Sequence, residues 1–188
     1  MIIASASENK DIEKRVAITP EIAKKYASLG FNVKIQKNYA SHLGISDDLY
    51  REQGVEINQD ISDVYENADI VIQLNLPSDE NLSKLKEHQC LVGVLDPYTN
   101  KEKINELINK KIKNFSLELL PRITRAQSMD ILSSQANLAG YKAVIESFSQ
   151  FEKAIPMMMT AAGTIPAAKV LVVGAGVAGL QAIATAKR

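Results

Sequence analysis

The sequence is poor in cysteine and carries no surplus of charge, and both absences exclude classes of protein. Cys90 is the single cysteine among 188 residues, so no disulfide can form within the chain and a reducing compartment is expected. It stands in the apolar run CLVGVL, where a thiol usually acts as a small buried hydrophobic group. Basic and acidic residues number 22 each, so the chain lacks the positive surplus that a nucleic-acid partner requires.

Long apolar runs and motifs for metal or covalent chemistry are also missing. No run of about 18 apolar residues occurs, so we do not expect the chain itself to span a membrane. The two histidines, His42 and His88, have no partner ligands at a convincing metal-binding spacing, so no metal is assigned. No nucleophile is recognisably paired with a base.

Strand-like and helix-like stretches alternate over the first 120 or so residues. After a short apolar start at 1–7, we expect strands at 31–37, 68–75, 90–95 and 112–120, and helices at 19–30, 46–54, 78–88 and 100–111. Thr19 can cap the first helix, Pro20 fits its first position and Gly30 can end it. Strands separated by helices of this length predict an α/β fold with a mostly parallel sheet.

A long helix should follow, from about Ser128 to Phe151, roughly 35 Å in length at 1.5 Å per residue. Small residues line one side of it, at Ser133, Ala136 and Gly140, which would let another backbone approach closely. We therefore expect an N-terminal α/β domain at 1–125, an interdomain helix at 126–152 and an incomplete Rossmann domain at 153–188. The three methionines at 157–159 are expected to fill a core or an interface.

The chain ends with a glycine motif typical of dinucleotide binding. In VLVVGAGVAG, a strand predicted at 169–174 runs into Gly174, Gly176 and Gly179, here called the glycine turn, and an Ala-rich helix follows. Gly174 would permit the tight turn, Gly176 would admit the pyrophosphate and Gly179 would let the helix pack closely. Helix N–H groups would then face the phosphates. The alternative is a glycine-rich turn without a ligand.

Polar side chains crowd the start of the long helix, in RITRAQSMDILSS. We call them the polar cluster: Arg122, Arg125, Gln127, Asp130, Ser133 and Ser134. One interpretation is a solvated helix start, with Ser128 and Asp130 near the cap and the dipole. The other is a set of donors and acceptors that grips an amide or a sugar. Arg15, in EKRVAITP, is most simply a surface arginine.

Three segments resemble a known family: KRVAITPE, PRITRAQSMDILSSQANLAGYKAV and AAGTIPAAKVLVVGAGVAGLQAI. They are similar to the NAD(H)-binding alpha subunit of proton-translocating nicotinamide nucleotide transhydrogenase, and the resemblance covers essentially the whole chain. The middle segment is the most specific, because related folds share the glycine turn but not the polar cluster. The resemblance favours a functional cluster over a plain helix start.

The resemblance implies two α/β domains with NAD(H) in the cleft between them. Arg122, Asp130 and Ser133 would hold the nicotinamide carboxamide and ribose, and Gln127 would reach toward the second nucleotide. Gln127 and Asp130 are thus the residues expected at the site of hydride transfer.

The resemblance also implies partners. NADP(H) would be bound by a separate subunit domain, and a membrane-spanning partner would couple hydride transfer to proton flow. The chain would be cytoplasmic, peripheral to the inner membrane through these partners, and homodimeric.

Two alternatives stay open. Alanine dehydrogenase is similar in its RVA-TP start, but its substrate lysine and histidine fall near Gln73 and Asp96, and neither is kept. Many transhydrogenases also carry a lysine at the Gln73 position. Arg15 would bind a carboxylate in the dehydrogenase. The second alternative is a nucleotide-binding remnant without catalysis.

The ribose-reading acid of such a fold lies about 20 positions beyond the glycine turn, past Arg188. We therefore expect the 188 residues to be a piece of a longer protein and to bind NADH weakly alone. The choice between NAD and NADP stays open for the same reason.

Overall fold

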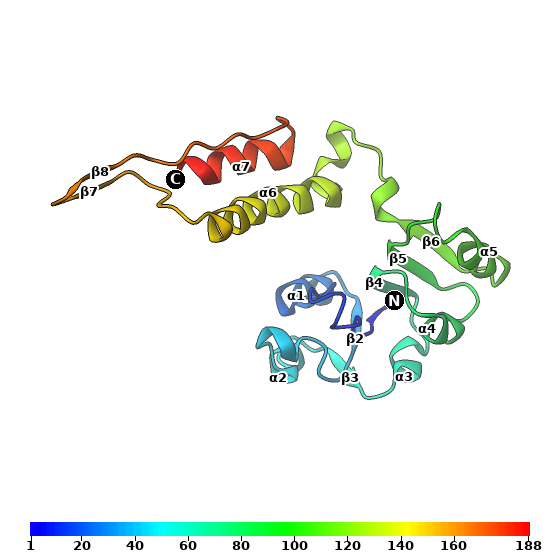
Figure 1. Cartoon of the computed structure of the whole chain (residues 1–188). Helices are drawn as coiled ribbons and strands as arrows, with labels where there is room; N and C mark the ends of the chain where they lie inside the picture. The colour runs from blue at the N-terminus through cyan, green and yellow to red at the C-terminus, as the bar shows by residue number, and fades with distance from the viewer. The chain divides into compact units, whose positions relative to one another are not determined.

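The computed structural model describes residues 1–188, and the chain divides into two compact units, Met1–Leu120 and Pro121–Arg188. The first unit is a six-stranded sheet in the order β3-β2-β1-β4-β5-β6, with every neighbouring pair parallel (Figure 1). Its strands are β1 Ile2–Ser5, β2 Asn32–Gln36, β3 Glu56–Asn58, β4 Ile70–Asn75, β5 Cys90–Val94 and β6 Lys113–Ser116. The expected α/β class and parallel sheet are confirmed. The strand order is that of a doubly wound fold, with its reversal between β1 and β4.

Helices cover both faces of this sheet. They are α1 Pro20–Ser28, α2 Asp47–Arg51, α3 Ile61–Tyr65, α4 Asp79–Ser83 and α5 Lys101–Asn109, with short 3-10 turns η1 Ser41–Leu43 and η2 Leu117–Leu119. One core cluster joins the sheet to α1 and α2, and the other joins it to α3, α4 and α5. Neighbouring residues of β1 divide between them, since Ile3 belongs to the first cluster and Ala4 to the second. This is the alternation of a strand buried on both faces.

The first helix begins and ends as its sequence predicts. The Thr19 hydroxyl accepts a hydrogen bond from the N–H of Ile22 at 3.4 Å, and Pro20 opens the helix. Gly30 follows with φ of +84°, a left-handed conformation that glycine adopts without strain.

Other predicted bounds need correction. The helix expected at 78–88 stops at Ser83, because Gln89 folds back and its amide joins Lys86 N–H to the carbonyls of Tyr65 and Ala68. The strand expected to reach residue 120 ends at Ser116, where η2 begins. Strand β3 and helix α3 were not expected; they are three and five residues long, too short for a periodic pattern to appear.

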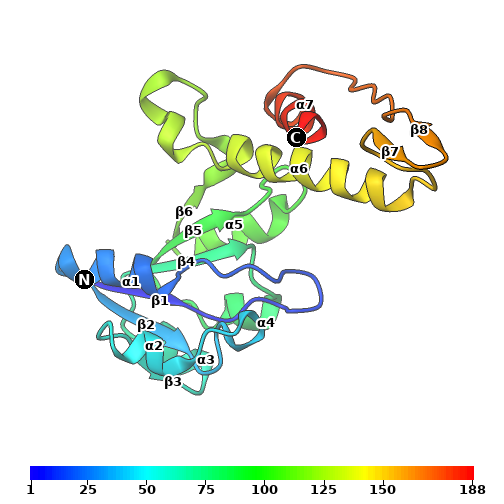
Figure 2. The ribbon, with the colours of Figure 1, turned by 90° about the vertical axis from the view of Figure 1, so that its left-hand side faces the viewer.

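The second unit consists of two packed helices and a hairpin. Its elements are the 3-10 turn η3 Thr124–Met129, α6 Ile131–Gln150, β7 Met158–Thr160, β8 Gly163–Ile165 and α7 Val177–Lys187. Helix α7 lies along α6 in both Figure 1 and Figure 2. The long helix begins at Ile131 rather than Ser128, because Asp130 is its cap and accepts a hydrogen bond from Ser133 N–H. The expectation that α6 links two domains is not tested by these contacts and stays a prediction.

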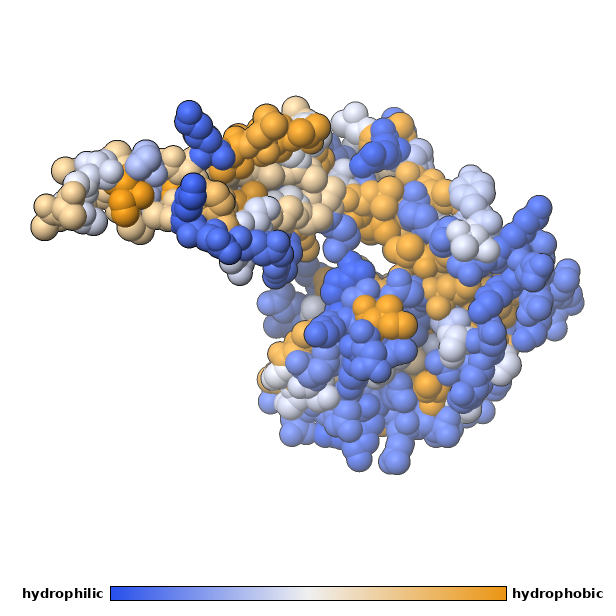
Figure 3. Space-filling view, viewed as in Figure 1, coloured by the Kyte–Doolittle hydropathy of each residue, from blue (hydrophilic) through white to orange (hydrophobic).

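The segment before α7 differs from the prediction. Residues 169–174 pair with no strand, so the expected strand is absent; a strand is defined by a partner that takes its backbone hydrogen bonds. Leu171 and Val173 are 88% and 92% exposed. Apolar surface over the second unit is visible in Figure 3.

The methionines at 157–159 lie at the antiparallel hairpin of β7 and β8, which was not expected, and all three are exposed. Filling of a core within the chain is therefore wrong for them, and a role at an interface stays a prediction. No helix of the structure combines the length and the apolar character needed to cross a bilayer.

Candidate functional site

The glycine turn has the conformation that its sequence predicts. Gly174 has φ of +103°, a backbone conformation that residues with a side chain rarely adopt. A Cβ on Gly179 would collide with the carbonyl oxygen of Gly174, so the first turn of α7 packs directly on the loop that precedes it. Gly176 is the N-cap of α7, and a Cβ built on it meets nothing within 4 Å. There is therefore free space beside the N-cap of this 11-residue helix.

The polar cluster is organised around Asp130. Its carboxylate accepts hydrogen bonds from Ser133 N–H at 3.0 Å, from Ser133 Oγ at 2.7 Å and from Arg122 Nε at 3.3 Å. Arg122 Nη2 also donates to Ser133 Oγ at 3.2 Å. The Ser133 hydroxyl and N–H, aided by the Arg122 guanidinium, hold the pKa of Asp130 below its ordinary value, so this group is ionised at neutral pH.

One pocket unites the polar cluster with the beginning of α7. Its volume is about 540 Å³, within the usual range for small-molecule sites. It is lined by Arg122, Ile123, Thr124, Gln127, Asp130, Ser133, Ser134 and Val177. Four residues predicted from the resemblance thus lie together, beside the first residue of the helix that follows the glycine turn. Arg125 does not line this pocket.

Three lining residues were not anticipated: Ile123, Thr124 and Val177. Thr124 stands inside the polar motif and could have been included for its hydroxyl. Val177 offers no polar signal, and only the packing of α7 on α6 brings it to the pocket. The glycines themselves do not line the pocket. Val177, the first residue of α7, follows Gly176 directly and is the residue of this segment that does.

These residues fit the two chemically distinct halves of a dinucleotide. Arg122 and the serine hydroxyls can donate to a carboxamide oxygen or a ribose, and Asp130 can accept from an amide N–H. The open helix N-terminus at Gly176 offers unpaired N–H groups and a positive dipole end to phosphates.

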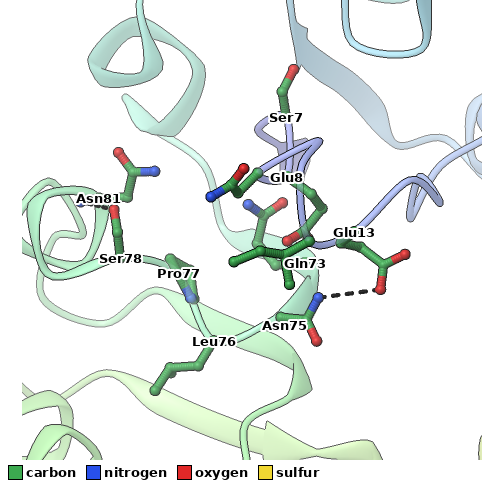
Figure 4. Close-up of a pocket in the computed structure, with 11 residues that line it drawn as sticks. Ser7, Glu8, Glu13, Gln73, Asn75, Leu76, Pro77, Ser78 and Asn81 are labelled. Carbon is green, nitrogen blue, oxygen red and sulfur yellow. Dashed lines mark hydrogen bonds between the residues drawn. The ribbon is translucent and has the colours of Figure 1, made fainter. Parts of the chain in front are cut away.

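The first unit has a pocket of its own, of about 290 Å³. It lies where the carboxyl ends of β1 and β4 meet, which is the reversal point of the strand order and the usual place of ligands in doubly wound folds. Figure 4 shows side chains entering it from the segment after β1, including Glu8 and Glu13, and from the end of β4, including Gln73 and Asn75. Glu8 follows the buried strand β1, and Asn75 is the last residue of β4. A polar residue at the end of a buried strand is a signal that could have identified both in the sequence.

Gln73, at the position where many transhydrogenases carry lysine, belongs to a buried neutral network. Only 4% of Gln73 is exposed. Its Oε1 accepts from Ser5 Oγ at 3.0 Å and from Ala6 N–H at 3.2 Å, and its Nε2 donates to the Tyr65 hydroxyl at 3.3 Å. A lysine at this position would have no carboxylate among these partners and would bury a charge.

Arg15 is held by Glu13 rather than pointing freely into water. Its Nε and Nη2 donate to the two oxygens of Glu13 at 2.8 and 2.6 Å. The side chain of Glu13 is 12% exposed and that of Arg15 is 49% exposed. Hydrogen bonds from Arg15 lower the pKa of Glu13 to about 2. Burial raises the pKa of Glu8, although the N–H of Leu74 donates to its carboxylate.

The remaining sequence candidates lie apart from both pockets or on the surface. Asp96 is exposed and its N–H donates to Glu118. His42 contacts the carbonyl of Lys14, and His88 lies beside Glu87. No three potential metal ligands come together in the structure.

The strand order of the first unit and the glycine turn before α7 are typical of nucleotide-binding α/β proteins, and comparison with known proteins gives the family. Residues 5–139 match the N-terminal domain of the alanine dehydrogenase/PNT family, and residues 143–188 match the C-terminal domain. The chain belongs to this family.

Individual relatives show which branch of the family the chain resembles more. The chain is 46% identical over 193 residues to a protein from Rhodospirillum rubrum that is named as the first part of NAD(P) transhydrogenase subunit alpha, covering 100% of the chain and 50% of that protein. It is similar to the crystal structure of transhydrogenase from Sinorhizobium meliloti, with a TM-score of 0.92 and 45% identity, covering 99% of the chain and 55% of the other.

An alanine dehydrogenase from Methanococcus maripaludis is 28% identical over 97% of the chain and 49% of its own length. The chain spans about half the length of the curated relatives it matches. Both branches of the family named in the sequence analysis are therefore among its relatives, with the higher identity on the transhydrogenase side.

Proposed function

We propose that the chain is the NAD(H)-binding part of an NAD(P) transhydrogenase that passes hydride between NADH and NADP⁺. The observation that carries the proposal is the pocket that joins Arg122, Gln127, Asp130 and Ser133 to the first residue of α7. The names of relatives with 45–46% identity support the same activity. Residues 1–125 would form the N-terminal domain, 126–152 the linking helix and 153–188 the beginning of the dinucleotide-binding domain.

Each side of the pocket has a task in this proposal. Asp130 accepts from the carboxamide N–H of the nicotinamide, while Arg122 and Ser133 donate to its oxygen or to the ribose. The glycine turn at Gly174, Gly176 and Gly179 brings the N–H groups of α7 to the pyrophosphate. Because Arg122, Asp130 and Ser133 are already hydrogen-bonded to one another, the site is organised before the ligand arrives.

Gln127 has a different task. It lies in η3, is exposed, and lines the same pocket. An exposed amide can donate to and accept from a second nucleotide that approaches the pocket from outside. Gln127 would thus set the approach of NADP(H), which a partner subunit holds.

When bound, NADH supplies the hydride. The chain's own contribution is positioning, since two rings held at near-attack distance need no added acid or base. Asp130 stays ionised while doing this, because its pKa is lowered by Ser133 and Arg122. The absence of a nucleophile–base pair in the sequence agrees with this assignment.

The proposal includes the assembly. An NADP(H)-binding subunit and a membrane-spanning subunit would couple hydride transfer to proton translocation, and the chain would form a homodimer on the cytoplasmic side of the inner membrane. The word "subunit" in the names of the relatives supports a multi-subunit complex.

Alanine dehydrogenase is the second candidate, and the first unit argues against it. An oxo acid needs positive charge at its site, yet Gln73 is neutral and hydrogen-bonded to Ser5 and Tyr65, and Arg15 is paired with Glu13. We expect no alanine-dependent reduction of NAD⁺ by this chain or by its longer form. A remnant without catalysis would share the pocket but fail to transfer hydride.

The test is ligand-observed saturation-transfer NMR with NADH on the 188-residue chain. Binding is expected to be weak, with the strongest transfer to the nicotinamide protons and the weakest to the adenine. A chain extended past Arg188 by about 150 residues, the size of a domain, should bind NADH more tightly in calorimetry. No transfer to nicotinamide, or adenine as the strongest signal, would refute the assignment of the pocket.

A further inference from the structure

Gly140, in the middle of α6, is the point where the backbones of α6 and α7 meet. It is buried, and a Cβ built on it would overlap the carbonyl oxygen of Ala178, the second residue of α7. The neighbouring carbonyl carbon and Cα of Ala178 lie at 2.8 and 2.9 Å from that Cβ, closer than real Cβ contacts. Since all three atoms are backbone, no side-chain movement could relieve the overlap.

A second contact fixes the two helices about one turn away from Gly140. Asn137 Nδ2 donates to Gln181 Oε1 at 3.3 Å, so the helices are joined three residues from Gly140 on α6 and three from Ala178 on α7. Ala182, the next residue on α7, is buried. Together with the backbone contact at Gly140, this hydrogen bond favours one distance between the helices and one rotation of α7 about its axis.

The same two helices carry the two halves of the proposed site. Helix α6 begins at the Asp130 cap and holds Ser133 in its first turn. Helix α7 begins at Gly176, and its first residue, Val177, lines the pocket beside those groups. The small-residue row predicted from the sequence therefore divides: Gly140 contacts α7, while Ser133 belongs to the pocket.

We propose that Gly140 is a positioning residue, which sets the distance between the nicotinamide-holding polar cluster and the phosphate-binding start of α7. This inference rests on the proposed function. A ligand that spans both places, NADH, would depend on Gly140. A ligand that carries the nicotinamide and its ribose but no phosphate, reduced nicotinamide riboside, would not.

A purely local role makes the opposite prediction. Glycine inside a helix is less favourable than alanine, because it loses more backbone freedom on folding. If Gly140 mattered only to α6, then Gly140→Ala would raise helix content and leave ligand binding unchanged. If it sets the packing of α7, helix content is kept while the binding of the spanning ligand falls.

The experiment compares the two ligands by NMR titration of the 188-residue chain and its variants. For Gly140→Ala we expect the NADH dissociation constant to rise about 10- to 100-fold, since misplacement by about 1 Å has effects of this order. The dissociation constant for reduced nicotinamide riboside, which has no phosphate, should change less than about twofold. Ala178→Gly should not rescue the variant, because the overlap is with backbone atoms.

Two further variants guard the interpretation. Asn137→Ala removes the second contact without adding an atom. It should raise the NADH dissociation constant about 2- to 10-fold, the effect of one hydrogen bond. Ser147→Ala, on an exposed turn of the same helix, is the matched control and should leave both ligands unaffected. Far-UV circular dichroism checks that α6 is intact in each variant.

The outcomes separate the inference from the function beneath it. Equal loss of both ligands in Gly140→Ala, or no loss of either, would overturn the positioning role while the proposed function stands. Failure of the unsubstituted chain to bind either ligand would overturn the proposed function, and this inference with it.

Discussion

Asp130 shows how one carboxylate can cap a helix and at the same time organise the lining of a pocket. It caps α6 through Ser133 N–H and holds Arg122 and the Ser133 hydroxyl around the pocket. The sequence placed it correctly near a helix start. Residue types alone do not separate the two interpretations, because a cap and a ligand-binding acid have the same residue type at the same position, and only the family resemblance favoured the functional one. The structure shows that the cap and the Arg122 contact coexist.

Replacing Asp130 with asparagine should separate its two roles. Asparagine caps helices about as well as aspartate, so the stability of the chain should change little. The affinity for NADH should fall by roughly 1–3 kcal/mol, because a hydrogen-bonded charge at the carboxamide is lost. Calorimetry on a chain extended past Arg188 would measure it, with Asp48→Asn in an exposed ion pair as the control. Undiminished affinity would leave Asp130 as a cap only.

Gln127→Asn tests the proposed role of Gln127, which is to guide the approach of the second nucleotide. Shortening the side chain by one methylene should spare NADH binding and slow hydride transfer, since only the approach of the NADP(H) ring depends on it. Single-turnover kinetics with the NADP(H)-binding partner would show the rate, and titration would show the affinity. Equal losses of rate and affinity in this variant and in Asp130→Asn would contradict separate roles.

The pair of Glu13 and Arg15 should make the stability of the chain depend on acid pH. The pKa of Glu13 falls from 4.5 to about 2 on folding, so its stabilisation is fully present above 4.5 and is lost as the pH falls toward 2. Because Arg15 is half exposed, we expect only about 1–2 kcal/mol.

Urea unfolding of Glu13→Gln beside the unsubstituted chain would measure this. The unsubstituted chain should be more stable near neutral pH, and the difference should shrink steadily below pH 4.5. A difference that stays constant across this range would mean that the ion pair contributes nothing on folding.

Among the elements, those with strong local signals were predictable and those defined by distant contacts were not. Helix α1 has its cap, its proline and its terminal glycine in the sequence, and all three act as expected. Helix α4 ends early because Gln89 binds carbonyls of residues 65 and 68, a contact that local sequence does not encode. The segment 169–174 has the composition of a strand but no partner in this chain.

Gly93 illustrates an element that depends on such a distant contact. It lies in β5, and a Cβ on it would overlap the carbonyl oxygen of Gln73 in β4. Gly93→Ala should therefore destabilise the first unit by about 1–3 kcal/mol, as overpacking does. Gly176→Ala is a suitable control, because its Cβ would meet nothing within 4 Å. Urea unfolding of the first unit can be monitored through its tyrosine signals. Equal urea midpoints for the two variants would show that strands β4 and β5 can move apart freely.

At the scale of the molecule, alternation of strands and helices was enough to predict a parallel sheet, but not its order. Strand order depends on which face each crossover helix covers, and β3 and α3 were too short to be seen in the sequence. As a result, the reversal between β1 and β4 and the pocket at that point were not foreseen. The polar cluster and the glycine turn were foreseen separately, and only the packing of α7 on α6 unites them.

The two compact units should behave differently when separated. Both core clusters lie within residues 2–112, so a chain ending at Leu120 contains a complete core and should unfold cooperatively, as small single domains do. It lacks the pocket formed by the polar cluster and Val177. Saturation-transfer NMR should therefore detect no nicotinamide contact with this shorter chain, although circular dichroism shows it folded. If the folded shorter chain contacts nicotinamide as strongly as all 188 residues do, NADH binds instead at the pocket between the ends of β1 and β4, and the site proposed for the second unit is wrong.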